Sequence, residues 1–183
     1  AFFMLTGELM TSATITDRLV ALSRALIGRI RGGLAQVNVL VSMFFAGMNG
    51  SVVADTATVG ALVLPAMKKA GYPAAFSAAV TGVSSTIGGI IPPSIMMIVL
   101  ANSTEISIAA LFAAGIIPGI LIGVVIMIIN HYFAIKYNFE RSDEPFSIRR
   151  AGKELYRSSF ALLIPLVLVG SVMGGVASVV EAG

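Results

Sequence analysis

The feature that most constrains this chain is an apolar stretch, residues 34–66, whose length fits neither one membrane helix nor two. A helix that spans a bilayer needs about 20 consecutive apolar residues. Asn49, Gly50 and Ser51 interrupt the stretch and leave apolar arms of only 15 residues (34–48) and 16 residues (52–67). These lengths predict a re-entrant hairpin, in which one helix enters the bilayer and the next returns to the same side.

Basic residues flank this hairpin at both ends. Lys68 and Lys69 follow it, and four arginines precede it: Arg18, Arg24, Arg29 and Arg31. Short loops rich in Lys and Arg stay in the cytoplasm, so both ends of the hairpin are expected on that side. Backbone that leaves helical geometry at membrane depth is tolerated only where protein or a water-filled cavity covers it. The polar turn therefore predicts a binding site, as in the interrupted helices of secondary transporters.

Composition places the whole chain in the membrane class. Of its 183 residues, 57% are hydrophobic and 11% are charged, which predicts an all-α integral membrane bundle. All twelve basic residues fall in three segments, 18–31, 68–69 and 136–157. The net charge of +3 therefore reports orientation against a lipid bilayer and gives no support for nucleic-acid binding. The absence of cysteine excludes disulfides and thiolate metal sites from this chain.

A second interrupted helix follows the hairpin. Residues 74–101 are long enough to span, but Gly88-Gly89 and Pro92-Pro93 fall together near the centre. Paired prolines remove two backbone donors and clash with the preceding turn, so this helix is expected to open there. We thus expect a helical bundle that combines a re-entrant hairpin with a broken transmembrane helix.

The other segments are assigned by hydropathy and charge. We expect the end of a membrane helix containing Glu8 (1–16), an Arg-bearing interfacial helix (17–33), an outer loop (102–105), a short return helix (106–114), an inward span (115–133), a charged cytoplasmic linker (134–157) and an outward span (158–180). The corresponding units are 1–33, 34–72, 73–114, 115–157 and 158–183.

Hydroxyl and amide oxygens at the two breaks are hard ligands that suit a small monovalent cation. The candidates for a cation site are Asn49, Gly50, Ser51, Ser84, Ser85 and Ser94, and those for a substrate lining are Ser51, Pro92, Pro93 and Ser94. Broken helices also offer their N-terminal N–H groups to an anion. Asp55 and Thr56 are expected to hold the hairpin tip, with direct cation binding by Asp55 as the alternative. A plain turn at Gly50-Ser51 and a simple kink at Pro92-Pro93 are the structural alternatives.

Five motifs in register resemble one known family. They are FFMLTGELM (2–10), RGGL (31–34), GSVVADTA (50–57), LPAMKKAGY (64–72) and IPPSI (91–95). Together they resemble the large membrane subunit of tripartite ATP-independent periplasmic (TRAP) transporters over residues 2–183. Asn49 stands where the family often has serine.

The resemblance implies a sodium-driven symporter for organic acids, such as C4-dicarboxylates, in the inner membrane of a bacterium or archaeon. It implies an elevator-type transport domain, sodium as the coupling ion with no other cofactor, a periplasmic substrate-binding protein and a small four-helix membrane subunit. It also implies an inverted-repeat fold of which this chain holds the first repeat.

Other classes compete with this interpretation. An intramembrane serine hydrolase would need a base near Ser51, and His131, the sole histidine, lies on a distant segment, so we expect no enzyme. A channel, a structural membrane subunit or an anion symporter that works without a binding protein would share the hydrophobicity and the polar breaks. Coupling of substrate to a sodium gradient distinguishes a symporter from a channel.

Overall fold

The fold is all-α, as predicted. The computed structural model describes residues 15–27, 30–139 and 148–174, and in these residues every regular element is a helix. The elements are α2 (Ile15–Ile27), α3 (Gly33–Asn49), α4 (Val52–Lys69), α5 (Ala74–Ser85), the 3-10 helix η1 (Thr86–Gly89), α6 (Ile95–Thr104), α7 (Ile108–Lys136) and α8 (Ile148–Met173). The expected helix end with Glu8, part of the cytoplasmic linker and the end of the last span lie outside the described residues.

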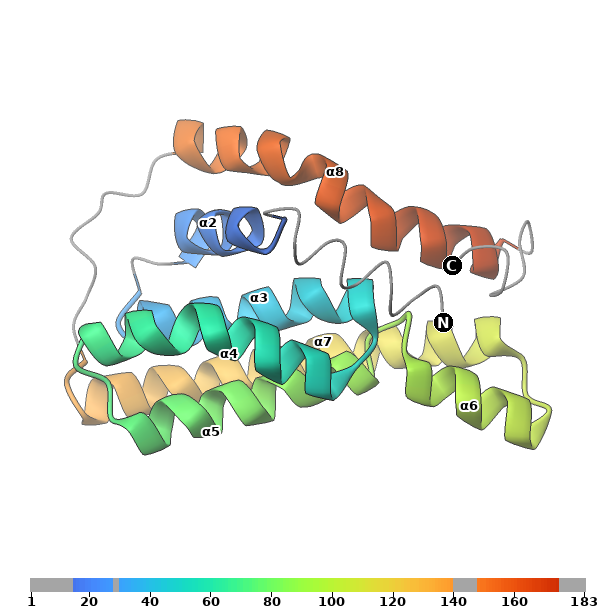
Figure 1. The fold of residues 1–183 in the computed structure, drawn as a ribbon, viewed down its shortest axis with the longest axis horizontal. Helices are drawn as coiled ribbons and strands as arrows, with labels where there is room; N and C mark the ends of the chain where they lie inside the picture. The colour runs from blue at the N-terminus through green and yellow to red at the C-terminus, as the bar shows by residue number, and fades with distance from the viewer. Residues whose placement is uncertain (1–14, 28–29, 140–147, 175–183) are drawn as a thin grey trace.

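Helix α3 is the centre of the bundle. It packs against α2, α4, α5, α7 and α8, and Figure 1 shows α2 and α8 on one side of it with α4, α5 and α7 on the other. Thirteen of its 17 residues are buried. The apolar arm 34–48 thus forms the core of the described part of the chain, with α4 returning beside it as the second arm of a helical hairpin.

Helix α7 carries the clearest membrane signal. Among the described residues it is the one helix both long and apolar enough to cross a bilayer, at 29 residues. The apolar helices α3 and α6 have 17 and 10 residues, which is short of the roughly 20 that a span requires. Their lengths fit elements that enter a membrane without crossing it alone.

Two boundaries that the sequence predicted between segments fall inside continuous helices of the structure. A separate return helix was expected at 106–114, yet α7 runs without a break from Ile108 to Lys136. The Ser107 hydroxyl caps this helix by accepting from the Ala110 N–H at 3.4 Å, and the alanines that follow favour helix. Likewise α8 joins the linker at 148–157 to the expected span. A change in hydropathy therefore does not end either helix.

Glycines on α7 allow close packing, two of them against the broken segment and Gly123 against Met43 of α3. Gly115, Gly119 and Gly123 recur every four residues and face the same side. A Cβ at Gly115 would overlap the Ile90 carbonyl oxygen, and one at Gly119 would overlap the Ile91 side chain. The unwound segment after η1 thus lies directly on the backbone of α7.

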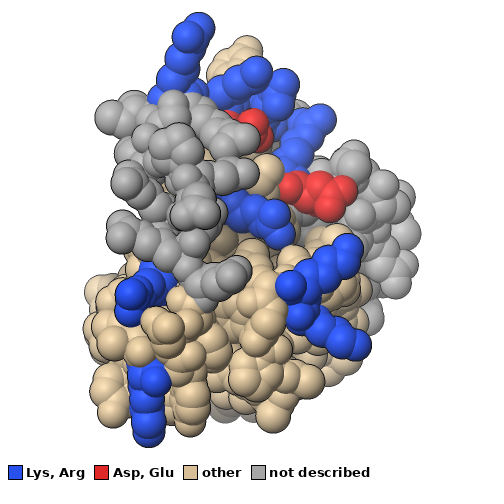
Figure 2. All heavy atoms as spheres, turned by 90° about the vertical axis from the view of Figure 1, so that its left-hand side faces the viewer, with Lys and Arg blue, Asp and Glu red and all other residues tan. Residues whose placement is uncertain are grey.

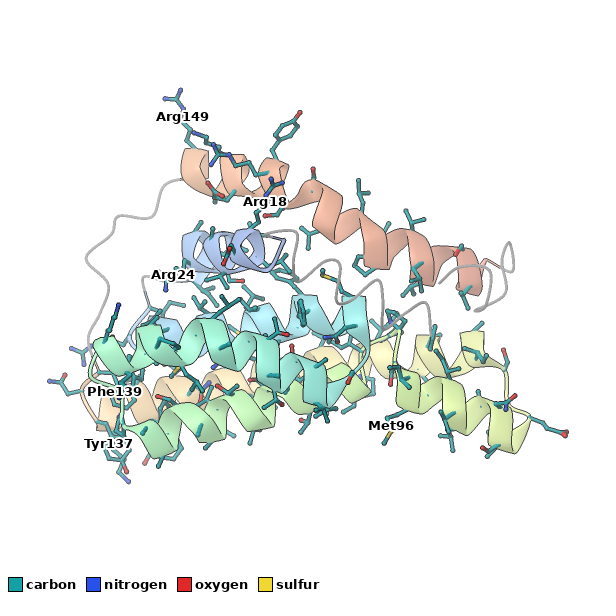
Figure 3. The ribbon with its side chains drawn as sticks, in the orientation of Figure 1. Arg18, Arg24, Met96, Tyr137, Phe139 and Arg149 are labelled. Carbon is teal, nitrogen blue, oxygen red and sulfur yellow. The ribbon has the colours of Figure 1, made fainter. Side chains whose placement is uncertain are left out.

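Basic side chains gather at one end of the bundle. Figure 2 shows Lys and Arg concentrated on the face seen from the left of Figure 1. Helix α4 ends there at Lys69 and α7 ends there at Lys136. An aromatic cluster lies at the same end, where the Tyr72 and Phe139 rings are 4.5 Å apart (Figure 3). Basic residues and aromatic rings at one end are typical of a membrane–water interface.

Helices α2 and α8 are joined near this end by polar contacts. Arg18 Nη1 donates to the Arg157 carbonyl oxygen at 3.2 Å, and Ser158 Oγ donates to the Arg18 carbonyl oxygen at 3.2 Å. Arg157 also pairs with Glu154 at 3.4 Å. These bonds fix the amphipathic start of α8 on the Arg-bearing helix α2.

We predict that Gly115→Ala lowers the Tm of the full-length protein, because the Ile90 carbonyl belongs to the backbone and cannot rotate away. Overpacking of this kind costs about 1–3 kcal/mol. Gly152→Ala in α8 is the control, since no atom lies within 4 Å of its added Cβ. Alanine is favoured over glycine inside a helix by about 0.5–1 kcal/mol, so the control should keep or raise the Tm. Equal shifts in thermal unfolding would contradict the packing role of Gly115.

Candidate functional site

The hairpin tip is a tight turn between α3 and α4. Gly50 ends α3 in the left-handed region, with φ 58° and ψ 15°, and its N–H donates to the Ala46 carbonyl oxygen at 3.2 Å. Ser51 is extended, and its hydroxyl caps α4 by accepting from the Ala54 N–H at 3.4 Å. Asn49 Oδ1 accepts from the Ser51 N–H at 3.1 Å. The polar residues that interrupt the apolar stretch therefore satisfy the backbone of the turn.

The broken helix opens where the glycines and prolines predict. Helix α5 ends at Ser85, η1 covers Thr86–Gly89, and the chain stays non-helical until α6 begins at Ile95. Ser94 caps α6 by accepting from the Met97 N–H at 3.4 Å, and its hydroxyl donates to the Gly89 carbonyl oxygen at 2.8 Å. Ser94 thus connects both sides of the unwound segment.

The tip and the unwound segment touch each other. The Ile95 N–H donates to the Gly50 carbonyl oxygen at 3.2 Å. A Cβ at Gly50 would overlap the Pro93 carbonyl oxygen and lie 3.1 Å from Ser94 Cα. We call this contact, formed by residues 49–51 and 92–95, the tip junction. It brings together Asn49, Gly50, Ser51, Pro92, Pro93 and Ser94, the candidate residues of both breaks.

Helix ends of both polarities meet at the tip junction. Helices α4 and α6 begin there, each with a capping serine, and α3 ends there. The N-terminus of a helix carries about half a positive charge and its C-terminus about half a negative charge. The junction can therefore attract an anion through the starts of α4 and α6 and a cation through the carbonyl groups at the end of α3.

Ser84 lies away from the tip junction, in a buried network that sequence reasoning missed. Asn38 Nδ2 donates to Thr81 Oγ1 at 2.7 Å, and Ser84 Oγ donates to Asn38 Oδ1 at 3.4 Å and to the Val80 carbonyl oxygen at 2.6 Å. These bonds join α3 to α5. Asn38 could have been found in the sequence as a polar side chain within an apolar arm, because a polar side chain that is buried needs a hydrogen-bond partner.

Asp55 and Ser85 form a separate buried cluster with Ser42. Asp55 is 0% exposed, and the hydroxyls of Ser42 and Ser85 lie beside its carboxylate. Neither carboxylate oxygen completes a hydrogen bond with a described residue. That Asp55 holds the hairpin tip therefore stays a prediction. Thr56, the other expected tip residue, is exposed and donates to the Val52 carbonyl oxygen at 2.8 Å.

Comparison with known proteins identifies the family. Residues 1–183 match the model of the tripartite ATP-independent periplasmic transporter, DctM component. The chain belongs to the TRAP transporter DctM family. This family assignment confirms the resemblance given by the five motifs.

The TRAP relatives are named as permeases and not as enzymes. The chain is 36% identical to the C4-dicarboxylate TRAP transporter large permease protein of Pseudomonas aeruginosa and 35% identical to the sialic acid TRAP transporter large permease protein of Vibrio cholerae, with 99% of the chain and 42% of each relative covered. It is 36% identical to the 2,3-diketo-L-gulonate TRAP transporter large permease protein of Escherichia coli, with 100% of the chain and 43% of the relative covered. The chain thus spans about two-fifths of the length of these relatives.

We predict that Gly50→Ala destabilises the full-length protein more than Gly71→Ala does. Both glycines have a positive φ, 58° and 77°, so both variants incur the left-handed penalty of about 1–2 kcal/mol. An added Cβ overlaps the Pro93 carbonyl oxygen at Gly50, whereas no atom lies within 4 Å of one at Gly71. Thermal unfolding of the two variants isolates the contact with Pro93, and equal losses of Tm would refute it.

Proposed function

We propose that this chain is the first-repeat half of a sodium-coupled transporter that imports organic acids across the inner membrane of a bacterium or archaeon. The observation that carries the proposal is the tip junction, in a chain of the TRAP family. Interrupted helices that meet near the middle of the membrane are the usual place for substrate and coupling ions in secondary transporters. The chain is in this view a multi-pass permease and has no enzymatic step.

Sodium binds at the tip junction through oxygens of Asn49, Ser51 and Ser94 and the carbonyl groups at the end of α3. This ion lowers the repulsion that a carboxylate meets on entering the site. The substrate then binds against the starts of α4 and α6, where the N–H groups of the first turns favour an anion. No lysine or arginine lies on α3, α5 or α6, or on α4 and α7 before their last turns. Helix ends and bound cations therefore supply the positive charge.

The relatives support organic acids as the substrate class. Their names cite a C4-dicarboxylate, sialic acid and 2,3-diketo-L-gulonate, and each of these three compounds carries a carboxylate. A site that binds the carboxylate through helix N-termini can accept organic acids that differ in the rest of the molecule. A periplasmic binding protein that delivers the substrate is then the main source of selectivity.

Transport proceeds by an elevator-type movement. The hairpin of α3 and α4 shares the tip junction and the Asn38 network with α5 and α6, so these elements move as one unit. Helices α2 and α8, joined to each other near the cytoplasmic end, belong to the fixed scaffold together with the small four-helix membrane subunit. A second inverted repeat supplies the other half of the site.

Uptake into proteoliposomes tests this function. The full-length protein, reconstituted with its small subunit and binding protein, should accumulate a labelled organic acid only with an inward sodium gradient; a dicarboxylate, sialic acid and a sugar keto acid form the first panel. Ser51→Ala should reduce uptake at least tenfold at equal protein levels, because it removes a sodium ligand.

Ser107→Ala is the matched control for this variant. Ser107 caps α7 through a bond of the same length, 3.4 Å, as the Ser51 cap of α4. Loss of either cap costs about 0.5–2 kcal/mol, but Ser107 lies outside the tip junction. If uptake falls equally in both variants, Ser51 acts only as a helix cap and not as a sodium ligand. If uptake by the wild type does not depend on sodium, the proposed coupling is wrong.

A further inference from the structure

The Asp55 carboxylate is unusual for its surroundings. Among the described residues it is the one acidic or basic side chain that is fully buried, at 0% exposure. It takes part in none of the described ion pairs. A charge taken out of water without a partner is strongly unfavourable, and the start of α4, where Asp55 lies in the first turn, compensates only part of it. A bound cation or a proton must therefore balance this charge when the hairpin is folded.

Three helices bring oxygen atoms to this carboxylate. Ser42 comes from α3, Asp55 from α4 and Ser85 from the last position of α5. Both serines are fully buried, and their hydroxyls lie beside the carboxylate. Yet Oδ1 and Oδ2 of Asp55, Oγ of Ser42 and Oγ of Ser85 make no hydrogen bond with any described residue. Four oxygen atoms therefore converge without the bonds that buried polar atoms normally make.

We propose that Asp55, Ser42 and Ser85 form a second cation site, separate from the tip junction, that binds a sodium ion between α3, α4 and α5. The proposal rests on the sodium coupling argued above and extends it. All four side-chain ligands are oxygens, and their single negative charge matches a monovalent ion. Calcium takes six to eight oxygen ligands, more than this set offers. The end of α5 at Ser85 adds partial negative charge.

The site is distinct from the tip junction by position and by contacts. Ser42 lies seven residues before Asn49 on α3, a distance of about 10 Å along the helix. The serines of the tip junction, Ser51 and Ser94, already cap α4 and α6, whereas the Ser42 and Ser85 hydroxyls cap no helix and face Asp55. An ion here would bind the two arms of the hairpin to α5 and so stiffen the moving unit.

Sodium-dependent stability of the purified full-length complex tests the site without relying on transport. The Tm is measured against NaCl at constant ionic strength, with choline chloride as the replacement salt and no substrate. The Ser51→Ala background is used because it weakens the tip junction. A ligand that binds only the folded state raises the Tm, and we expect this background to retain a clear rise with sodium.

Two serine variants in that background probe the site itself. Ser42→Ala and Ser85→Ala should each raise the sodium concentration for half-maximal stabilisation about tenfold, the lower end of what lost support costs a metal site. Ser77→Ala is the matched control: this serine is also buried on α5, and its hydroxyl donates to the Pro73 carbonyl oxygen at 3.0 Å. The control should leave the sodium dependence unchanged.

The Asp55→Asn variant distinguishes a cation-binding role of Asp55 from a purely structural role. It keeps the shape and removes the charge, so we expect a Tm in sodium-free buffer no lower than that of the Ser51→Ala parent, and no further rise with sodium. A structural Asp55 would instead give a Tm lowered equally at all sodium concentrations, which would overturn the proposal.

The remaining outcomes also discriminate. A sodium response in the Ser51→Ala background that Ser42→Ala and Ser85→Ala leave unchanged would refute this site, while sodium-driven uptake by the wild type would still support the proposed function. If neither the Tm nor the uptake depends on sodium, both the second cation site and the proposed function are wrong.

Discussion

The structure depends on one contact, in which the carbonyl oxygen of Gly50 accepts the N–H of Ile95 at 3.2 Å. Two breaks in apolar helices expose backbone groups that lipid cannot satisfy. Here each break supplies partners for itself through Ser51 and Ser94, and this bond joins the two breaks. Only glycine permits the approach, because a Cβ at position 50 would overlap the Pro93 carbonyl oxygen. The hairpin and the broken helix are therefore one structural unit.

The layers around this unit follow from the same constraint. Helix α3 is buried on nearly all sides, so its polar side chains face the interior of the bundle, where Asn38 bonds to Thr81 and Ser84. Helix α7 presents glycines to the unwound segment, which lets its backbone approach closely. Lys and Arg side chains gather at one end (Figure 2), as is usual where a membrane protein meets water and lipid headgroups. The proposed site then lies where helix ends are brought together inside an apolar core.

Local chemistry made some of these features predictable and left others hidden. The breaks at Gly50 and at Pro92-Pro93 could be predicted because glycine and proline act on the backbone at their own position. The continuity of α7 could not, since a polar loop and a capped helix start, such as that at Ser107, look alike in sequence. Ser42 was missed because a lone serine in an apolar arm gives no sign of what it faces. Its partners, Asp55 and Ser85, come from other helices, and only tertiary packing reveals the cluster.

Crosslinking beside the tip junction, between the hairpin and the broken helix, tests most directly whether these two elements move as one unit. The chain has no cysteine, and a Cβ at Gly89 would lie 3.3 Å from Val52 Cγ2, so Val52→Cys with Gly89→Cys places two thiols in contact across the two elements. In a cysteine-free full-length background, the account predicts that the pair crosslinks readily and that the crosslinked transporter retains sodium-driven uptake. A pair that does not crosslink, or uptake that stops on crosslinking and returns on reduction, would contradict it.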